Sequence, residues 1–380
     1  MKKLKSYFIA LILLMAPISS FALDITSDGK WQLNSVIRLR FEDDWDGIKA
    51  NGISTYPDRQ RIRVKANTEL QYKPTSEFTF GTRLSLGDSN QNSVTNVTLF
   101  NFQGTTQVKT DVFFDKWYAR VDKSNWWAWG GRNVVPFWQQ NDYFWDYSAV
   151  TVAGGALGHA ETFGNKTLSF NLGGFALPDG SRNFNGQLVS TQVVGTLKQD
   201  DKLWTSALGL FQFYGGKNGL YSYYGTGVNR GDRDYRVAVL NLQYRYPIAG
   251  RPLIFGADGY WNTQDYSANN PSDVYAAKYR NQVLGGLLSV QYGTVSKAKE
   301  WLVAYSYAYI EALAINPDFG QTDWTRATQS INDNKGHEFR AGYAINDKLS
   351  LSSRLFLVEG VSTKNDSENK RVRLDLTYKF

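Results

Sequence analysis

The chain has 380 residues, of which 20% are charged and 15% aromatic, with a formal net charge of +7 and no cysteine. Its mean hydropathy of −0.41, with no long apolar stretch after residue 17, excludes a helical membrane protein. The basic residues are spread through strand-like segments and not gathered in one tail or helix, so nothing indicates nucleic-acid binding.

The first 22 residues have the pattern of an export signal. Lys2, Lys3 and Lys5 precede an apolar run over 7–17, and Ser20-Phe21-Ala22 offers small residues at positions −3 and −1 of a cleavage site. The run is shorter than the ~20 residues of a membrane-spanning helix. We therefore predict a signal peptide over 1–22 and a single domain over 23–380.

Alternating polar and apolar residues then recur to the end of the chain. Segments of this pattern, bounded by Gly, Pro, Asn, Asp or Ser, are long enough for the ~9–11 residues of a tilted membrane-spanning strand. About sixteen are predicted: 31–43, 58–73, 77–88, 109–121, 126–134, 147–156, 166–176, 185–199, 202–214, 233–246, 252–263, 279–292, 299–312, 335–345, 348–359 and 370–380.

The connections between these segments alternate in length. Short turns are expected at 74–76, 122–125, 200–201, 247–250 and 346–347, and long connections at 44–57, 89–108, 135–146, 177–184, 215–232, 264–278, 313–334 and 360–369. The segments 157–165 and 293–298 are long for tight turns, so fourteen or eighteen strands remain alternatives. The fold class is all-β: a transmembrane antiparallel β-barrel with short periplasmic turns and long extracellular loops.

Aromatic residues recur at the predicted periplasmic strand ends, as in an interfacial girdle. The alternative is that Tyr and Trp simply favour strands. The residues are Trp31, Tyr72, Trp126, Trp127, Trp204, Tyr246, Tyr292, Trp301, Tyr343 and Tyr378.

Cations occupy one face of several predicted strands. In the second strand Arg59, Arg61, Arg63 and Lys65 alternate with residues of the other face. Each cation facing lipid would cost ~2–4 kcal/mol at the midplane, so this face is predicted to line the lumen. The same argument places Arg38, Arg40, Arg83, Arg340, Arg354, Arg371 and Arg373 inside. Because closure brings the last strand beside the first, these residues are expected to form one patch across the seam.

Two interpretations of this patch stay open. It can favour anions or, with acidic groups opposite, set up a transverse field; the candidate acidic residues are Glu42, Asp43, Asp111, Asp115, Asp142 and Asp146. Alternatively, the charges solvate the lumen wall and Arg–Asp pairs hold neighbouring strands together.

About the first 160 residues carry motifs of a known family. These are RQRIRV at 59–64, FGTRLSLGD at 80–88, VTNVTL at 94–99, FDKWYAR at 114–120 and GGRNVVPFW at 130–138, followed by Asn141-Asp142, Trp145-Asp146 and Gly154-Gly155. The stretch resembles bacterial outer-membrane proteins grouped as putative porins. Residues 147–150, YSAV, depart from the more acidic, Asn-Pro-containing link expected after the Trp-Asp pair. The resemblance implies a pore and names no solute.

The connection 136–146 is the predicted constriction. Its aromatic residues can anchor it to the inner wall while its polar residues meet solute, although packing on the outer rim is an alternative. The residues concerned are Phe137, Trp138, Gln139, Gln140, Asn141, Asp142 and Asp146. The terminal Phe380 looks like the aromatic signal read by barrel-assembly machinery.

Other functional classes have less support. His159 and His337 are the only imidazoles, and neither has a Ser, Asp or His at a spacing that would assemble a nucleophile–base pair. No metal site is predicted, although Glu42-Asp43-Asp44 with Asp46 would be the place to consider Ca²⁺. A loop-mediated adhesin or structural barrel is the other alternative, but about sixteen strands leave an aqueous lumen.

The sequence therefore predicts a porin of the bacterial outer membrane, passing small hydrophilic solutes by passive diffusion with an anion preference. No enzyme activity and no cofactor are implied. The expected partners are outer-membrane lipid and lipopolysaccharide, the barrel-assembly machinery and small hydrophilic or anionic solutes. A homotrimer is expected by analogy with general porins, and no nucleic acid is expected.

Overall fold

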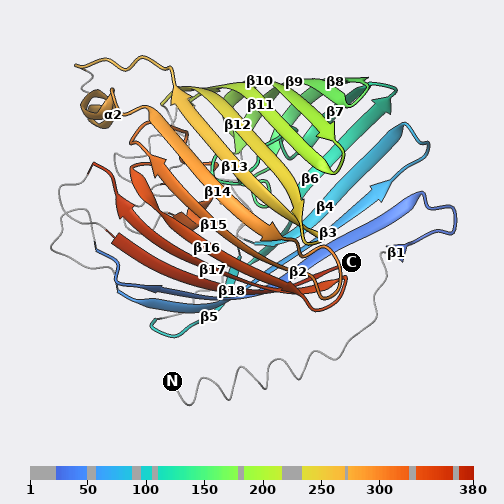
Figure 1. Cartoon of the computed structure of the whole chain (residues 1–380), viewed down its shortest axis with the longest axis horizontal. Helices are drawn as coiled ribbons and strands as arrows, with labels where there is room; N and C mark the ends of the chain where they lie inside the picture. The colour runs from blue at the N-terminus through green and yellow to red at the C-terminus, as the bar shows by residue number, and fades with distance from the viewer. Residues whose placement is uncertain are drawn as a thin grey trace.

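A computed structural model describes residues 23–48, 57–87, 96–104, 110–178, 184–215, 233–269, 273–324, 331–362 and 368–380. The predicted signal peptide lies outside these ranges. One antiparallel sheet closes on itself as a barrel (Figure 1). Among the described residues, no helix is long and apolar enough to cross a membrane.

Sixteen strands form the wall, each paired with the strand before and after it. They are β2 (Trp31–Trp45), β3 (Arg59–Tyr72), β4 (Phe78–Gly87), β6 (Asp111–Lys123), β7 (Trp126–Asn133), β8 (Val152–Phe163), β9 (Lys166–Pro178), β10 (Phe184–Gln199), β11 (Lys202–Tyr214), β12 (Tyr235–Ile248), β13 (Arg251–Asn262), β14 (Leu284–Gly293), β15 (Trp301–Ile310), β16 (Asn334–Ala344), β17 (Leu349–Gly360) and β18 (Glu368–Lys379).

The barrel closes between β18 and β2, whose register runs from Lys370 opposite Trp45 to Lys379 opposite Val36. Phe380 adds a backbone pair with Ser35, donating its N–H and accepting at its carbonyl oxygen. Because closure removes the free strand edges, every wall strand has two partners. The sixteen-stranded antiparallel barrel predicted from the alternation is confirmed.

Two short strands lie outside this count. β1 (Leu23–Asp24) pairs with the start of β2. β5 (Val97–Asn101) lies within the predicted long connection 89–108 and pairs with β3 at Arg61–Val64, beyond the point where β4 ends its own pairing with β3. β5 therefore extends the wall beside β3.

The connections alternate in length because tight turns join every second pair of strands. The two-residue connection between β10 and β11 contains Asp200 at φ 56°, and that between β12 and β13 contains Ala249 at φ 49° and Gly250 at φ 74°. Positive φ at such positions matches the twist of a tight hairpin. The long connections lie at the opposite end, so the start of β2 and the end of β18 share the turn end.

Three predicted segments need correction. The sixth strand, predicted over 147–156, is β8 at 152–163, so the connection 157–165 shrinks to Gly164-Asn165. The twelfth, predicted over 279–292, begins only at Leu284, because α2 (Val274–Tyr279) is capped by Asp273 and occupies the chain before it. The connection 293–298 is 294–300 and joins two regular strands, so the alternatives of fourteen or eighteen strands are excluded.

Most of the predicted girdle residues lie at the turn end. Trp31 stacks on Tyr72, with ring centroids 4.5 Å apart, and Trp301 lies 5.6 Å from Tyr292. Trp127 is an exception, because it alternates with the exposed Trp126 and packs against the buried interior residues. It therefore belongs to the inner face.

Candidate functional site: the barrel interior

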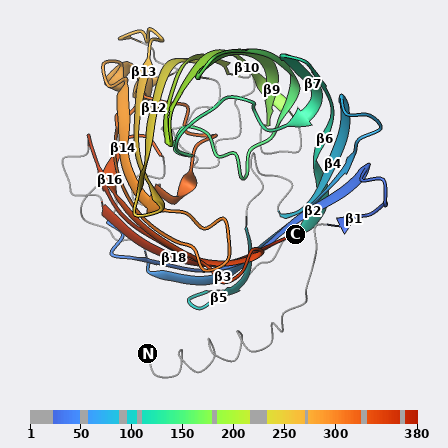
Figure 2. The ribbon, with the colours of Figure 1, turned by 45° about the vertical axis from the view of Figure 1, so that its right-hand side comes forward.

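The segment 134–151, here called the first inner loop, lies inside the ring of strands (Figure 2). Strand alternation identifies the inner face: on β10, Gln192 is buried whereas Val189 and Val193 are exposed outward. The Gln192 side chain accepts from the backbone N–H of Trp138 at 2.7 Å and donates to its carbonyl at 2.7 Å. The backbone of the loop is thus attached to the inner wall.

Two further side chains anchor this loop. Phe137 packs edge-on against Phe211, with ring centroids 5.3 Å apart. Gln140 donates to Asp258 of β13 at 2.7 Å and accepts from Ser289 of β14 at 3.1 Å. Phe137 and Gln140 thus bind inner-wall residues on both sides of β12.

A second segment enters the interior. The second inner loop comprises the described residues 311–324 and 331–333, including η1 (Thr322–Trp324), and most of its residues are buried. It bonds the first inner loop through Asp146 N–H to the Phe319 carbonyl (2.8 Å), and Trp145 stacks on Phe319 at 5.2 Å. The sequence prediction missed this loop. The apolar run Ala312-Leu313-Ala314-Ile315 in a long connection was its signal.

The two inner loops divide the interior into unlike halves. Against β7–β14 they bury one apolar cluster that includes Phe144, Trp145, Phe211, Tyr260 and Phe319. The opposite wall, formed by β16–β18 with β2 and β3, carries the predicted cations. The apolar cluster reaches this wall only through Phe356 and Val358 of β17, so charge is gathered on the side that the cluster covers least.

Most of the predicted inward cations form ion pairs. The pairs are Arg40 with Asp375, Arg59 with Asp44, Arg61 and Arg63 with Glu42, Arg83 with Asp115, Arg354 with Glu338, Arg371 with Asp44 and Asp323, and Arg373 with Asp323 and Asp375. Glu42 is fully buried and Arg40 is only 3% exposed. Much of the wall is thus a charge-balanced network that joins neighbouring strands.

The network crosses the seam of the barrel. Arg371 of β18 donates to Asp44 of β2 at 2.5 Å, and Arg40 of β2 donates to Asp375 of β18 at 2.6 and 3.0 Å. Reciprocal exchange of this kind follows from the register, which places Asp44 opposite Arg371 and Arg40 opposite Asp375. The sequence prediction included these arginines but missed Asp44 and Asp375 as their partners.

Three of the predicted cations lack a carboxylate partner within the described part of the chain. Arg38 donates to Asn96 Oδ1 at 2.8 Å, and Lys65 donates to the carbonyl of Ser148 in the first inner loop. Arg340 is exposed on the inner face and forms no ion pair. None of these three residues forms an ion pair with a carboxylate within the described ranges.

Carboxylates of the first inner loop face this wall. Asp146 interacts electrostatically with Arg38 and Lys65. Asp142 is 41% exposed and lies 3.8 Å from Arg354, with Arg340 also in electrostatic range. Of the other predicted acidic partners, Glu42 and Asp115 lie within the wall itself, and Asp43 accepts from Gln60.

The remaining loop residues have local roles. Gln139 donates to the Trp145 carbonyl at 2.6 Å, and Asn141 accepts from Tyr143 N–H at 2.8 Å. Both bonds lie within the first inner loop, so they hold its shape. Asp142 and Asp146 are the charged residues of this loop.

The described residues contain no cluster of His, Cys, Asp and Glu that would hold a metal ion. Within the acidic run considered for Ca²⁺, Glu42 and Asp44 bind arginines and Asp46 binds Lys370. His159 lies 2.9 Å from Glu161, and His337 bonds Tyr305 at 2.8 Å; both are strand residues far apart on the barrel. These contacts account for the acidic run and for both histidines.

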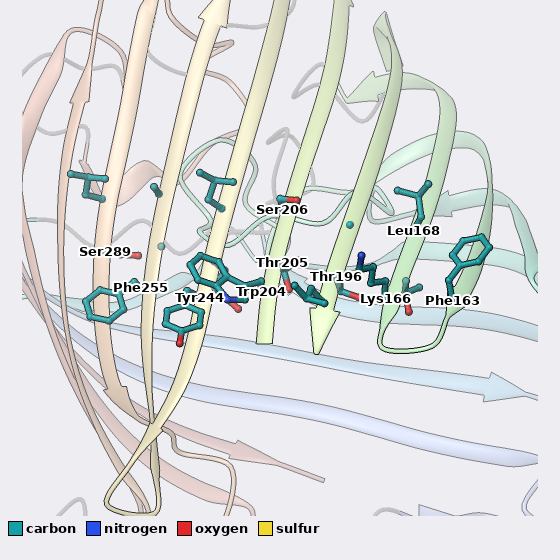
Figure 3. Close-up of a pocket in the computed structure, with 18 residues that line it drawn as sticks. Phe163, Lys166, Leu168, Thr196, Trp204, Thr205, Ser206, Tyr244, Phe255 and Ser289 are labelled. Atoms are coloured by element: carbon teal, nitrogen blue, oxygen red, sulfur yellow. The ribbon is translucent and has the colours of Figure 1, made fainter. Parts of the chain in front are cut away.

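A separate groove of 840 Å³ lies across β8–β14 (Figure 3). Its large lining side chains, among them Phe163, Leu168, Trp204 and Phe255, are exposed on the outward face, and Trp204 stacks on Tyr244 at 4.0 Å. Such a surface suits contact with lipid. The groove is therefore part of the outer apolar belt and not of the charged interior.

Comparison with known proteins finds a family match over part of the chain and similar folds over most of it. A family described as Putative porin matches residues 45–218, which span β3–β11 and the whole first inner loop. No match is found among curated proteins.

Several solved structures are similar over nearly the whole chain. OprB of Pseudomonas putida matches with a TM-score of 0.58 and 11% identity, over 93% of this chain and 95% of that chain. A loop-deleted OmpT of Vibrio cholerae gives 0.53 and 11%, over 92% and 100%. OmpF of Salmonella typhi, in a complex with daunomycin, gives 0.51 and 10%, over 93% and 99%. At these identities the likeness is one of fold.

Proposed function

We propose that this chain, which matches the Putative porin family over residues 45–218 and has a porin-like fold, is an outer-membrane porin channel that passes small hydrophilic solutes by passive diffusion and prefers anions. The observation that supports the preference is the wall of β2, β3 and β16–β18. Its cations Arg38, Lys65 and Arg340 lack a carboxylate partner within the described ranges. Positive charge on a pore wall raises the local concentration of anions.

We propose the first inner loop as the constriction. Its anchors, Phe137, Trp138 and Gln140, hold it against β10–β14, and its carboxylates Asp142 and Asp146 face the cationic wall. A solute that passes between the two would exchange part of its hydration for weak contacts on both sides. The wall and the loop together would then set the selectivity.

Conductance of purified protein in a planar bilayer tests the channel, and the reversal potential in a salt gradient tests the preference. We expect discrete current steps and an anion-favouring reversal potential. Silence across many insertions of an intact barrel would instead favour a plugged or adhesive barrel.

The first prediction concerns the charge of the wall. Arg61→Gln together with Arg63→Gln removes two cations and leaves the Glu42 carboxylate, so the reversal potential should move toward cation selectivity. Arg83→Gln with Asp115→Asn removes an ion pair without changing the net charge and should leave it unmoved. Unchanged selectivity in the double arginine variant would remove these residues from the selectivity element.

The partners follow from this proposal. The apolar outward face would contact membrane lipid, with lipopolysaccharide at the loop end. The aromatic Phe380 would serve as the signal for barrel-assembly machinery. A homotrimer stays a proposal by analogy with general porins.

A further inference from the structure

Four cations meet in two adjacent register pairs of the inner wall. Arg38 lies opposite Lys65, and Arg40 lies opposite Arg63, on the neighbouring strands β2 and β3. Side chains directly opposite in an antiparallel pair have Cβ atoms about 4.5–5.5 Å apart, and like charges there are destabilising. Such an arrangement requires anionic groups that bind it.

Arg40 and Arg63 bind carboxylates directly, whereas Arg38 and Lys65 form no ion pair within the described ranges. Arg40 binds Asp375 through two hydrogen bonds, and Arg63 binds Glu42. Arg38 and Lys65 have only an amide oxygen of Asn96 and a backbone carbonyl of Ser148 as acceptors within the described ranges. The Arg38 Nε atom is buried with no acceptor among the described residues. Uncompensated donors of this kind are costly unless a ligand supplies the acceptor.

We propose that Arg38 and Lys65 form a binding subsite for the carboxylate group of small monoanionic solutes. The Arg38 Nε–H would donate to one carboxylate oxygen, and the Lys65 ammonium, which has three donors, would donate to the other. This inference deepens the proposed function and rests on it, since the solute must reach the subsite through an open channel.

The charge of the surroundings favours a monoanion. Asp146 of the first inner loop interacts with both Arg38 and Lys65, so these three groups together carry a charge of +1, and the neighbouring Arg40–Asp375 ion pair adds no net charge. The Asp146 carboxylate is held in place because its Oδ1 accepts from the N–H of Ser148 at 2.9 Å. One carboxylate neutralises the remaining charge. The repulsion from Asp146 also keeps binding weak enough for the solute to leave.

The test is the conductance of the full-length protein in planar bilayers as a function of sodium propionate concentration. Binding predicts that the conductance saturates, at a half-saturating concentration that reports the affinity of the subsite. Loss of one charge-assisted hydrogen bond in Arg38→Gln should raise this concentration about tenfold. Asp146→Asn should lower it, because it removes the repulsion.

Arg120→Gln is the matched control. Arg120 is also a charged residue of the wall strands, but it is paired with Asp122 at the turn end of β6, so the half-saturating concentration should not change. Poor folding of a variant cannot explain the expected result, because the half-saturating concentration should rise in Arg38→Gln and fall in Asp146→Asn.

Two different failures can be told apart. The subsite alone would be overturned if the channel conducts chloride but its propionate conductance rises linearly with concentration. It would also be overturned if the half-saturating concentration is the same in the Arg38→Gln and Arg120→Gln variants. Absence of any current in chloride would overturn the proposed channel function and the subsite with it.

Discussion

Asp323 joins the second inner loop to the cationic wall. Its carboxylate binds both Arg371 and Arg373 of β18, and all three side chains are nearly fully buried. Each arginine also has a wall carboxylate, Asp44 for Arg371 and Asp375 for Arg373. Asp323 is therefore needed to hold the loop rather than to neutralise the wall.

Replacement of this residue tests its role. Asp323→Asn should weaken the attachment of the second inner loop by about 1.5–3 kcal/mol, the usual contribution of hydrogen bonds to a charged group. We expect more frequent current fluctuations in single-channel recordings, with the barrel still assembled. Fluctuations as rare as in the unmodified protein would show that the apolar contacts alone hold the loop.

At this scale the sequence predicted the kinds of residue and missed their pairings. Strand alternation was enough to place Arg371 and Arg373 on one face, because side-chain direction has a period of two. It could not identify Asp44, Asp323 and Asp375 as their partners. Those pairs depend on the register between β18 and β2 and on a loop that folds in from another part of the chain.

The hairpin of β6 and β7 requires a glycine at one position. Gly131 has φ 123°, and a Cβ atom there would lie 2.3 Å from the backbone oxygen of Trp117 on the neighbouring strand. The adjacent Gly130 has no such conformation, and the nearest atom to its added Cβ is at 4.0 Å. A side chain at Gly131 would therefore clash with the neighbouring strand, whereas one at the adjacent Gly130 would not.

Gly131→Ala should therefore destabilise the barrel, by about 1–3 kcal/mol from the backbone conformation alone and by more from the contact with Trp117. Gly130→Ala is the control and should be nearly neutral. The fraction of protein that stays folded in urea, followed by gel mobility without heating, compares the two. Equal stability of the two variants would contradict the assignment.

The second inner loop should respond to pH. Burial raises the pKa of Asp318 to about 7, with Arg233 opposing the shift. A carboxyl group whose pKa is raised in the docked loop binds its proton more tightly there than when it is free in water. Docking is then most stable below the ordinary pKa of about 4 and is weakened as the pH rises toward 7.

We therefore expect the loop to be cleaved faster by an added protease at pH 8 than at pH 5.5, after correction for protease activity on an unfolded substrate. Asp318→Asn cannot ionise and should reduce this difference. A protein whose loop is equally resistant at both values would contradict a buried carboxyl group in this position.

The elements of the wall were predictable and the interior loops were only partly so. The alternation of polar and apolar residues predicted each of the sixteen strands, since one face meets lipid and the other the interior. It failed near residue 150, because Ala149, Val150 and Val152 are buried by loop packing and carry no alternation. The second inner loop was missed because apolar residues in a connection have no strand periodicity.

For the whole molecule, the interior is asymmetric. An apolar cluster supported by two loops lies mainly against β7–β14, while the other side carries ion pairs and three cations that form no ion pair within the described ranges. The sequence predicted the cationic side from the free-energy cost of placing charged side chains against lipid. The apolar filling of the other side could not be predicted, because it depends on residues of distant connections meeting inside a closed barrel.

The seam between β18 and β2 has a consequence for assembly. The Arg40–Asp375 and Arg371–Asp44 ion pairs both join β2 to β18 across this seam, so a barrel that has not yet closed lacks these two pairs. Closure is therefore an electrostatic step as well as a hydrogen-bonding one. Its rate in refolding should fall as ionic strength rises, because salt screens the attraction between two edges that still approach through water.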